Sequence, residues 1–166
     1  MIPVVSIVGK SGSGKTTLIE KVIPELTRKG WRVATIKHSN RGFDIDREGK
    51  DSWRHRKAGA RMTVMSSPGQ IAVIENSEKN PGIEELRDRY IHDVDIIITE
   101  GFKGNPYPKI EVFRATLKRD MLCSREDNLI AVASDKQMEI DVPCLDINDM
   151  EGIAQLIIDL FLSKVT

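Results

Sequence analysis

The residues with the most specific chemistry in this chain are Gly9–Thr16, which read Gly-Lys-Ser-Gly-Ser-Gly-Lys-Thr. They fit the pattern G-x-x-x-x-G-K-[ST] of loops that hold nucleotide phosphates. Such a loop wraps closely round phosphates with its backbone N–H groups pointing inward, and the helix that follows adds partial positive charge. In this pattern Lys15 reaches the β- and γ-phosphates and the hydroxyl of Thr16 contacts Mg²⁺. The sequence therefore predicts binding of a nucleoside phosphate, with Mg²⁺ as the cofactor.

The residues on either side of this loop form the elements that must position it. An apolar run at residues 2–8 predicts a short buried strand, and apolar residues at helical spacing predict a helix over residues 16–29. Pro24 lies inside this helix, where it should cause a kink, and Gly30 is a natural residue at its end. A strand, a loop and a helix in this order favour a true phosphate loop over a chance match in a Gly/Ser-rich turn.

Strands and helices alternate along the rest of the chain. Strands are predicted at residues 32–37, 62–66, 71–75, 94–99, 109–114 and 129–133, and helices at residues 53–60, 80–91 and 150–162. A turn at Ser67-Pro68-Gly69 joins two of these strands as an antiparallel hairpin on the edge of the sheet. We expect an α/β fold of the P-loop NTPase type, with a mostly parallel sheet flanked by helices in a single nucleotide-binding domain over residues 1–166.

Composition excludes several classes of partner. The 166 residues include 25 acidic and 25 basic side chains, so no overall field favours nucleic acid or an anionic membrane surface. No apolar run is long enough to span a membrane, and the N-terminus carries no basic region or small-residue cleavage site. Cys123 and Cys144 fit neither a metal site nor a disulfide framework. We therefore expect a cytoplasmic domain with reduced thiols that contacts neither nucleic acid nor membrane.

Two predicted strands end in residues that could act on a bound nucleotide. Glu100 follows an isoleucine-rich strand, where P-loop enzymes place an acid that holds Mg²⁺ or positions the attacking water. Lys37 ends another strand and could contact phosphates from the far side of the cleft. We take both as candidate catalytic residues, and Glu100 also as a metal ligand. The alternatives are that Glu100 caps a turn and that Lys37 is a solvated strand end.

A long polar loop at residues 42–52 carries three aspartates. Such loops in P-loop proteins often order around the γ-phosphate and Mg²⁺, which makes Asp51 a candidate metal ligand. Asp51 could also cap the helix that follows, and the two roles are compatible. Asp44 and Asp46 superficially resemble the start of an EF-hand, but the glycine and glutamate that a calcium loop needs are absent in register.

Several short motifs occur in one order along the chain and resemble a known family. They are the phosphate loop with Thr17, Ile36-Lys37-His38, Asp44-x-Asp46, Gly49-Lys50-Asp51-Ser52, Ala58-Gly59-Ala60, Glu100-Gly101-Phe102-Lys103, Ser134-Asp135 and the segment 143–149. The set is similar to the molybdopterin-guanine dinucleotide biosynthesis protein B (MobB) family over nearly the whole chain. The phosphate loop is shared by many families, so the motifs at residues 37–60 and 100–103 are the specific part.

The resemblance implies a GTP-binding protein with weak GTPase activity that forms a homodimer. Such a protein would assist the step that joins GMP to molybdopterin. Its partner would be the MobA-type molybdopterin nucleotidyltransferase, and molybdopterin itself is a further candidate ligand.

The resemblance also assigns site residues by matching motif. The candidate nucleotide-binding residues in and after the loop are Gly9, Lys10, Ser11, Gly12, Ser13, Gly14, Lys15, Thr16 and Thr17. Asp51 and Glu100 would lie near the metal or the water, and Lys103 could approach the phosphates or a partner's ligand. Lys10 stands at an early loop position where a related loop variant keeps a lysine that can reach across a dimer, although Ser11 replaces the glycine that usually follows.

The identity of the base is not encoded by a familiar string, because the guanine-reading motif Asn-Lys-x-Asp is absent. Asp135 follows the predicted strand at residues 129–133, where a carboxylate could accept N–H bonds from guanine N1 and N2. Asp135 could equally be an ordinary turn acid, so the expectation of GTP as the ligand comes from the resemblance.

Two other functions compete with this interpretation: a P-loop small-molecule kinase or ligase, and a non-catalytic nucleotide sensor. A kinase normally carries a lid in which several arginines close on the phosphates. Arg114, Arg119 and Arg125 form the only such cluster, and they are few and scattered.

Overall fold

The computed structural model describes residues 1–40 and 42–163, and these divide into two compact units. The first unit contains residues 1–38 and 91–163, and the second, Ser39–Tyr90, is inserted between these two parts. Each unit has its own β-sheet. The sequence analysis treats the chain as one domain and does not anticipate the insertion.

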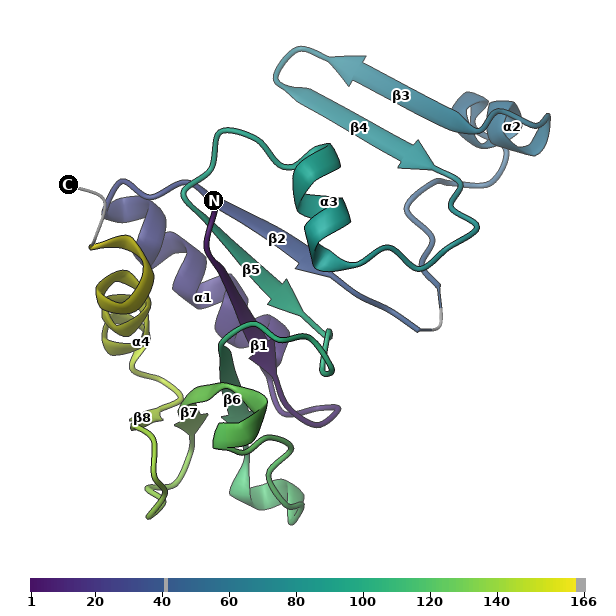
Figure 1. Ribbon diagram of the computed structural model, residues 1–166. Helices are drawn as coiled ribbons and strands as arrows, with labels where there is room; N and C mark the ends of the chain where they lie inside the picture. Colours follow the sequence, from purple (N-terminus) through teal and green to yellow (C-terminus); the bar gives the residue numbers. More distant parts are fainter. Residues whose placement is uncertain (41, 164–166) are drawn as a thin grey trace. The chain divides into compact units, whose positions relative to one another are not determined.

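The first unit is built on a six-stranded sheet in which every neighbouring pair of strands is parallel (Figure 1). In sheet order the strands are β2 (Val33–Lys37), β5 (Ile96–Glu100), β1 (Val4–Val8), β6 (Lys109–Phe113), β7 (Leu129–Ser134) and β8 (Cys144–Asp146). The central strands β1 and β5 consist mainly of valine and isoleucine, as is typical of parallel strands that are buried on both faces. The predicted α/β fold with a mostly parallel sheet is confirmed.

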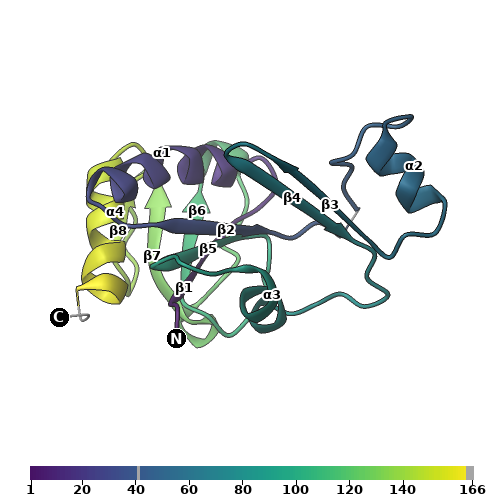
Figure 2. The same cartoon turned by 90° about the horizontal axis from the view of Figure 1, so that it is seen from above.

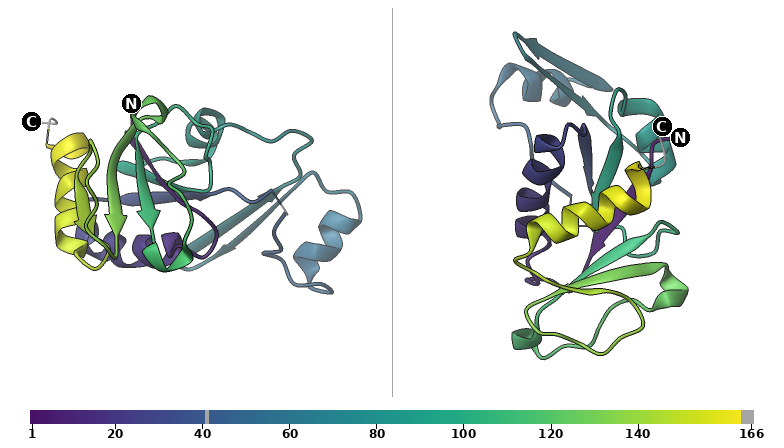
Figure 3. Two further views of the ribbon diagram at one scale, coloured as in Figure 1. Left: turned by 90° about the horizontal axis from the view of Figure 1, so that it is seen from below. Right: turned by 90° about the vertical axis from the view of Figure 1, so that its left-hand side faces the viewer.

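One face of this sheet is covered by α1 (Lys15–Arg28) and α4 (Met150–Ile157), which pack against each other (Figures 1, 2 and 3). A π-helical turn at Ile158–Leu162 continues α4. Apolar residues of both helices join alternate strand residues, such as Val5 and Ile98, in one hydrophobic core. This core fixes the start of α1 beside the end of β1. Within the described residues, no helix combines the length and the apolar character that crossing a membrane requires.

The opposite face of the sheet carries buried polar side chains. Thr99 Oγ1 donates to Ser6 Oγ at 2.8 Å, which links β5 to β1. Lys109 is only 2% exposed, and its ammonium donates to the backbone carbonyls of Asn105 and Asp127, both at 2.6 Å. A buried charge is tolerated when its hydrogen bonds are satisfied. Lys109 therefore holds the segments before β6 and before β7 against the sheet.

Glu111 is the second buried charge on this face. Its carboxylate accepts hydrogen bonds from the backbone N–H groups of Leu122 at 2.7 Å and Cys123 at 2.9 Å. Burial raises the pKa of Glu111, and the two N–H bonds act in the opposite direction. The two bonds fix the far end of the segment that follows β6.

The second unit consists of α2 (Asp51–Lys57), β3 (Met62–Ser67), β4 (Gln70–Glu75) and α3 (Ile83–Tyr90). The strands β3 and β4 form the predicted antiparallel hairpin, with Ser67 opposite Gln70 and Gly69 at φ 80° in the turn. Its predicted place is wrong, because in the described residues the hairpin forms a two-stranded sheet of its own and adds to no edge of the larger sheet. The turn sets the register of such a hairpin, so its pairing needs no third strand.

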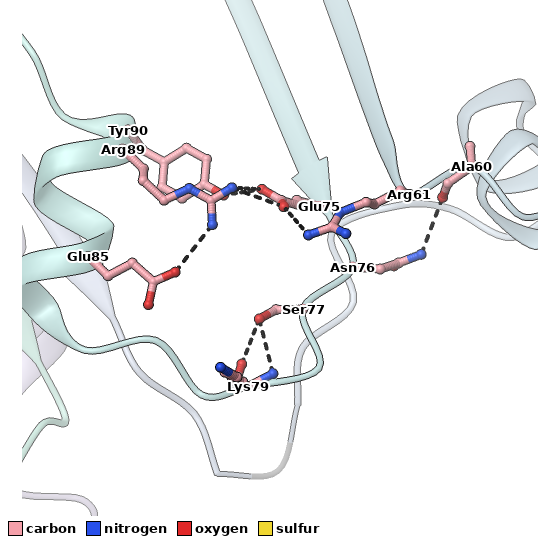
Figure 4. A network of polar contacts seen from close by, with 9 residues as sticks. All are labelled: Ala60, Arg61, Glu75, Asn76, Ser77, Lys79, Glu85, Arg89 and Tyr90. Atoms are coloured by element: carbon pink, nitrogen blue, oxygen red, sulfur yellow. Dashed lines mark hydrogen bonds and ion pairs between the residues drawn. The ribbon is translucent and has the colours of Figure 1, made fainter.

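Polar contacts around Glu75 link the hairpin to α3 (Figure 4). The Glu75 carboxylate accepts hydrogen bonds from Arg89 Nη2, at 2.9 Å for the closer oxygen, and from the hydroxyl of Tyr90. Arg61 lies 3.7 Å from the same carboxylate, and Arg89 also pairs with Glu85 at 3.2 Å. The hydrogen bond from Tyr90, followed by those from Arg89, lowers the pKa of Glu75. Polar contacts to the largely buried carboxylate of Glu75, more than apolar packing, thus join these elements.

Candidate functional site

The phosphate loop connects β1 to α1, and its glycines adopt conformations that side chains rarely reach. Gly9, Gly12 and Gly14 have φ of 146°, 79° and 99°. A Cβ on Gly9 would lie 2.5 Å from the carbonyl oxygen of Val112 and 2.7 Å from Ser13 Oγ, so both space and conformation demand glycine there. Gly14 is the N-cap residue of α1. The helix therefore begins directly at the loop, as predicted from the sequence.

Ser13 is the most deeply buried polar residue of the loop. It is 1% exposed, and its hydroxyl has no hydrogen-bond partner in the part of the chain that the structure describes. Its backbone N–H donates to the carbonyl of Lys10 at 3.2 Å, which closes a turn within the loop. Buried hydroxyls in proteins normally have a partner. An unpaired one inside a phosphate-type loop is a donor that a ligand oxygen could use.

The ammonium of Lys15 folds back over the loop. It donates to the carbonyl oxygens of Gly9 at 3.1 Å and Lys10 at 3.0 Å. Burial lowers the pKa of Lys15, the negative charge of Glu100 raises it, and the positive charges of Lys103 and Lys37 lower it further. These effects mean that three lysines and one carboxylate lie close together at the loop.

Glu100 is the centre of this charged group. Its Oε1 accepts a hydrogen bond from Thr16 Oγ1 at 2.9 Å, and its Oε2 lies 3.4 Å from the ammonium of Lys37. The sheet explains the arrangement, because β5 lies between β2 and β1 and Lys37 is directly opposite Glu100. The structure therefore brings together three candidate residues, Thr16, Lys37 and Glu100, that lie far apart in the sequence.

The segment after Glu100 turns sharply and carries Lys103. Gly101 has φ 105°, and a Cβ there would lie 2.7 Å from the carbonyl oxygen of His38. The rings of His38 and Phe102 pack with centroids 4.6 Å apart, a contact that the sequence analysis missed. The N–H of Lys103 donates to the Gly101 carbonyl at 2.8 Å, so the backbone at Lys103 doubles back toward the strand end.

The other side of the loop contacts two arginines that follow β6, and the segment at the first of these also contacts Asp135 after β7. Arg114 Nε donates to the carbonyl of Ser13 at 3.3 Å, and Arg119 Nη1 donates to the carbonyl of Ser11 at 3.4 Å. Asp135 Oδ1 accepts a hydrogen bond from the backbone N–H of Ala115 at 2.9 Å. Sequence reasoning dismissed these arginines as a scattered cluster, because it lacked the sheet order that brings the end of β6 next to the loop.

The remaining candidates occupy simpler positions. Thr17 is exposed in the first turn of α1. Lys10 is close enough to Glu111 for its charge to lower the pKa of that carboxyl. Asp51 belongs to the second unit, is 89% exposed and lies 3.8 Å from Arg54. It is the first residue of α2 and not its N-cap, because Lys50 occupies the cap position.

Hydrogen bonds within the second unit account for the burial of Asp46 without a bound metal ion. Its carboxylate is 4% exposed and accepts hydrogen bonds from Ser52 Oγ at 2.8 Å and from Arg56 at 3.0 Å. Those bonds, with that from Ser52 the larger effect, lower the pKa of Asp46. Over residues 1–40 and 42–163, no group of three or more His, Cys, Asp or Glu side chains is arranged to hold a metal ion. Mg²⁺ commonly takes only one or two protein ligands besides phosphate and water, so Thr16 and Glu100 suit it.

Known proteins resemble this chain over most of its length. The sequence model of the family described as molybdopterin guanine dinucleotide synthesis protein B matches residues 4–135. The chain belongs to this family. The match includes the phosphate loop, Lys37, Glu100 and Asp135 and the whole of the inserted unit.

Individual relatives are similar to this chain over most of its length. This chain is 39% identical over 157 residues to the molybdopterin-guanine dinucleotide biosynthesis adapter protein of Haemophilus influenzae, and the match covers 94% of this chain and 88% of that protein. It is 38% identical over 168 residues to the adapter protein of Escherichia coli, covering 96% and 93%. A crystal structure of molybdopterin-guanine biosynthesis protein B superposes with a TM-score of 0.75 and 29% identity, over 95% of this chain and 99% of that chain.

Proposed function

We propose that this MobB protein binds GTP with Mg²⁺ and acts as an adapter in the attachment of GMP to molybdopterin. The adapter role is taken from the relatives, which carry that description at 38–39% identity. The observation that carries nucleotide binding is the meeting of Lys15, Thr16 and Glu100 at a loop that also leaves the Ser13 hydroxyl unpaired.

The loop offers several donors to a triphosphate. The first four N–H groups of an α-helix have no partner inside the helix, and those at the start of α1 lie at the loop. The Ser13 hydroxyl adds a further donor. The Lys15 ammonium would exchange the carbonyl oxygens of Gly9 and Lys10 for phosphate oxygens, which are the stronger acceptors.

Thr16 and Glu100 would hold Mg²⁺, directly or through water. The ion would neutralise phosphate charge and order the phosphates against the loop. The hydrogen bond between these two side chains places their oxygens 2.9 Å apart, so one ion could contact both. Asp51, in the second unit, is proposed as an additional ligand on the basis of the family motif alone.

We propose that GTP hydrolysis is slow. Glu100 is the one carboxylate among the charged residues grouped at Lys15, and it is already engaged by Thr16 and Lys37. A carboxylate whose two oxygens already contact a hydroxyl and an ammonium has fewer free lone pairs with which to orient a water. Slow turnover suits an adapter that presents a bound nucleotide to a partner, here a MobA-type nucleotidyltransferase.

A homodimer in the cytoplasm completes the proposal. Several apolar side chains of the hairpin are exposed in the single chain, among them Ile71 at 71% and Val64 at 59%. Exposed apolar surface of this kind often marks a contact with another protein. Light scattering over a range of concentrations would give the oligomeric state.

Calorimetric titration with GTP, ATP and GMP in the presence of Mg²⁺ tests the binding proposal. We expect GTP to bind more tightly than GMP, because the loop residues contact the outer phosphates. The adapter role is tested by the yield of guanine dinucleotide cofactor from a MobA-type transferase with and without this protein. Absence of both effects would contradict the proposal, and GTP-dependent phosphorylation of a small molecule would identify a kinase instead.

A further inference from the structure

Arg114 joins two parts of the site that the family motifs treat separately. It follows the last residue of β6 and is 37% exposed. Its Nε donates to the carbonyl of Ser13 in the phosphate loop at 3.3 Å, and its Nη1 lies 4.0 Å from Asp135 Oδ2 at the end of β7. Its Nη2 lies 3.5 Å from the position that a Cβ on Gly14 would occupy. One guanidinium therefore spans from the loop to the candidate base-reading acid.

The order of the strands makes this span possible. β6 lies between β1, which leads into the loop, and β7, which leads into Asp135. Phe113 is directly opposite Ser134 in the register of β6 and β7, so the residues that follow them emerge side by side. A residue after β6 thus has the loop on one side and Asp135 on the other, and the forked arginine side chain has donors for both.

The backbone around Arg114 is fixed at both ends of the segment that follows β6. At the near end the N–H of Ala115 donates to Asp135 Oδ1 at 2.9 Å. At the far end Leu122 and Cys123 donate to the buried carboxylate of Glu111. Asp135 is therefore contacted by Arg114 and by its neighbour in the chain, which limits the orientations that its carboxylate can adopt.

The segments that follow Arg114 and Asp135 line an open hollow that is large enough for a nucleobase. It has a volume of about 610 Å³ and is lined by residues that follow β6 and β7, including Ala115, Lys136 and Met138. Ligand sites of small molecules commonly have volumes of this order. The hollow lies next to Asp135 in the chain and shares Ala115 with it.

We propose that Arg114 is a positioning residue for base recognition, which holds the Asp135 carboxylate at a set place relative to the phosphate loop. The ligand would be a purine nucleotide whose base presents two adjacent N–H donors to that carboxylate, as guanine does and adenine does not. The inference rests on the proposed binding of GTP. It goes further by naming the residue that couples recognition of the base to recognition of the phosphates.

The test measures selectivity between bases, which a general loss of structure would not alter. Calorimetric dissociation constants for GTP, ATP and XTP with Mg²⁺ would be measured for wild type, Asp135→Asn, Arg114→Gln and Arg114→Lys. We expect Asp135→Asn to lose its preference for GTP over ATP and to gain affinity for XTP, because an amide offers one acceptor and one donor. We expect Arg114→Gln to reduce the ratio of GTP to ATP affinity about tenfold while the ATP constant changes less than about threefold. Arg114→Lys keeps the charge but loses the fork, so it should reduce the ratio as well.

Arg28→Gln is the matched control. Arg28 is an exposed arginine at the end of α1 that pairs with Glu25, and it lines neither the loop nor the hollow. Its loss should leave both the GTP and the ATP constants unchanged. Circular dichroism of each variant would establish that it is folded.

Three results separate the possible failures. Equal weakening of GTP and ATP by Arg114→Gln would show that Arg114 serves the phosphates, and the inference would be wrong. A full preference for GTP in Arg114→Gln, together with its loss in Asp135→Asn, would also overturn the inference and leave the proposed function intact. A wild-type protein that binds GTP and ATP equally would overturn the proposed guanine preference and the inference with it.

Discussion

The two units of this protein are stabilised in different ways. In the first unit, β-strands and helices share a hydrophobic core that includes Val5, Leu26 and Ile98, each at most 1% exposed. In the second unit, Ile83, at 2% exposed, is the only buried hydrophobic residue among those described. Its elements are instead connected by polar contacts such as the ion pair between Arg89, which is 45% exposed, and the largely buried carboxylate of Glu75.

This difference bears on where side chains must be held in exact positions. Phosphate-binding residues must be held within a fraction of an ångström, and a close-packed core resists small displacements. Ion pairs with one partly exposed partner, such as that of Arg89, fill space less completely than close-packed apolar side chains and resist small displacements less. The first unit therefore suits the proposed nucleotide-binding residues, whereas the second unit exposes apolar side chains on a framework with few buried hydrophobic residues.

The largest expected effect comes from the same substitution made in both units. Ile98→Ala removes a side chain that is 1% exposed, and we expect it to lower the free energy of unfolding by about 2–5 kcal/mol. Ile71→Ala removes a side chain that is 71% exposed in the hairpin, and it should cost less than about 1 kcal/mol. Urea unfolding followed by circular dichroism would measure both.

The measured cost of Ile71→Ala also tests whether the hairpin is covered in a homodimer. A cost close to that of Ile98→Ala would show that the hairpin is covered in solution. If that cost grew with protein concentration, the covering surface would be a second copy of the chain. Similar costs for Ile71→Ala and Ile98→Ala, with no dependence on protein concentration, would show that the two units are not stabilised in different ways.

The second prediction concerns the phosphate loop. Lys15→Ala should weaken GTP binding by roughly 2–4 kcal/mol and leave the fold intact, because a partly buried charge-assisted contact is lost. Lys21→Ala is the control, since Lys21 is an exposed lysine of the same helix. Titration calorimetry would compare the variants. Unchanged affinity in folded Lys15→Ala would remove the loop from the proposed site.

Much of the first unit could be predicted from the sequence, because its signals are local and strong. The loop pattern between an apolar run and a helical pattern gave β1, the loop and α1, and the isoleucines before Glu100 gave β5. The expected place of Glu100 beside Thr16 followed from the common topology of phosphate-loop proteins, and their 2.9 Å hydrogen bond agrees with it.

The parts that could not be predicted depend on contacts between distant segments. The strand β8 has three residues, too few for a recognisable period. The polar stretch at residues 42–52 was interpreted as a loop of the nucleotide site, although it belongs to the start of the second unit. Arg114 was considered only as one of three scattered arginines, because its contacts with Ser13 and Asp135 exist only once β6 lies between β1 and β7. Spacing along the chain carries no information about that order.

The third prediction compares one acid from each unit. Glu100→Gln should bind GTP but hydrolyse it about 10- to 100-fold more slowly, because the amide keeps the shape and loses the charge that orients a water or a metal. Asp51→Asn should leave hydrolysis at saturating Mg²⁺ nearly unchanged and raise the Mg²⁺ concentration needed for half-maximal binding. Phosphate release at several Mg²⁺ concentrations would measure both. Wild-type turnover in Glu100→Gln would make Glu100 a turn residue, and an unchanged Mg²⁺ requirement would exclude Asp51 from the metal site.

The smallest expected effect is a difference in acid sensitivity between the units. Hydrogen bonds from Tyr90 and Arg89 hold the pKa of Glu75 below its ordinary 4.5, and those from Ser52 and Arg56 hold the pKa of Asp46 below 3.8. A carboxyl with a lowered pKa in the folded state contributes stability above its unfolded pKa, and that stability is lost as the pH falls through the folded pKa.

Glu111 in the first unit has the opposite sign. Burial raises its pKa above 4.5, so its ionisation opposes folding, and its contribution improves as the pH falls toward 4.5. Asp95 and Asp127 of the first unit have lowered pKa values like those of the second unit, but the hydrophobic core does not depend on them. The second unit should therefore lose its structure at a higher pH than the first.

The two tryptophans allow this difference to be measured, because Trp31 lies in the first unit and Trp53 in α2 of the second. Fluorescence of Trp31→Phe reports the second unit alone, and that of Trp53→Phe reports the first. During acid titration from pH 7 to pH 2, we expect the Trp53 signal to change before the Trp31 signal. In a Glu75→Gln background the Trp53 transition should become less steep, since one titrating carboxyl is removed. Coincident transitions for both tryptophans would mean that the units unfold as one cooperative structure, and the separation between a core-stabilised unit and an ion-paired one would not hold in solution.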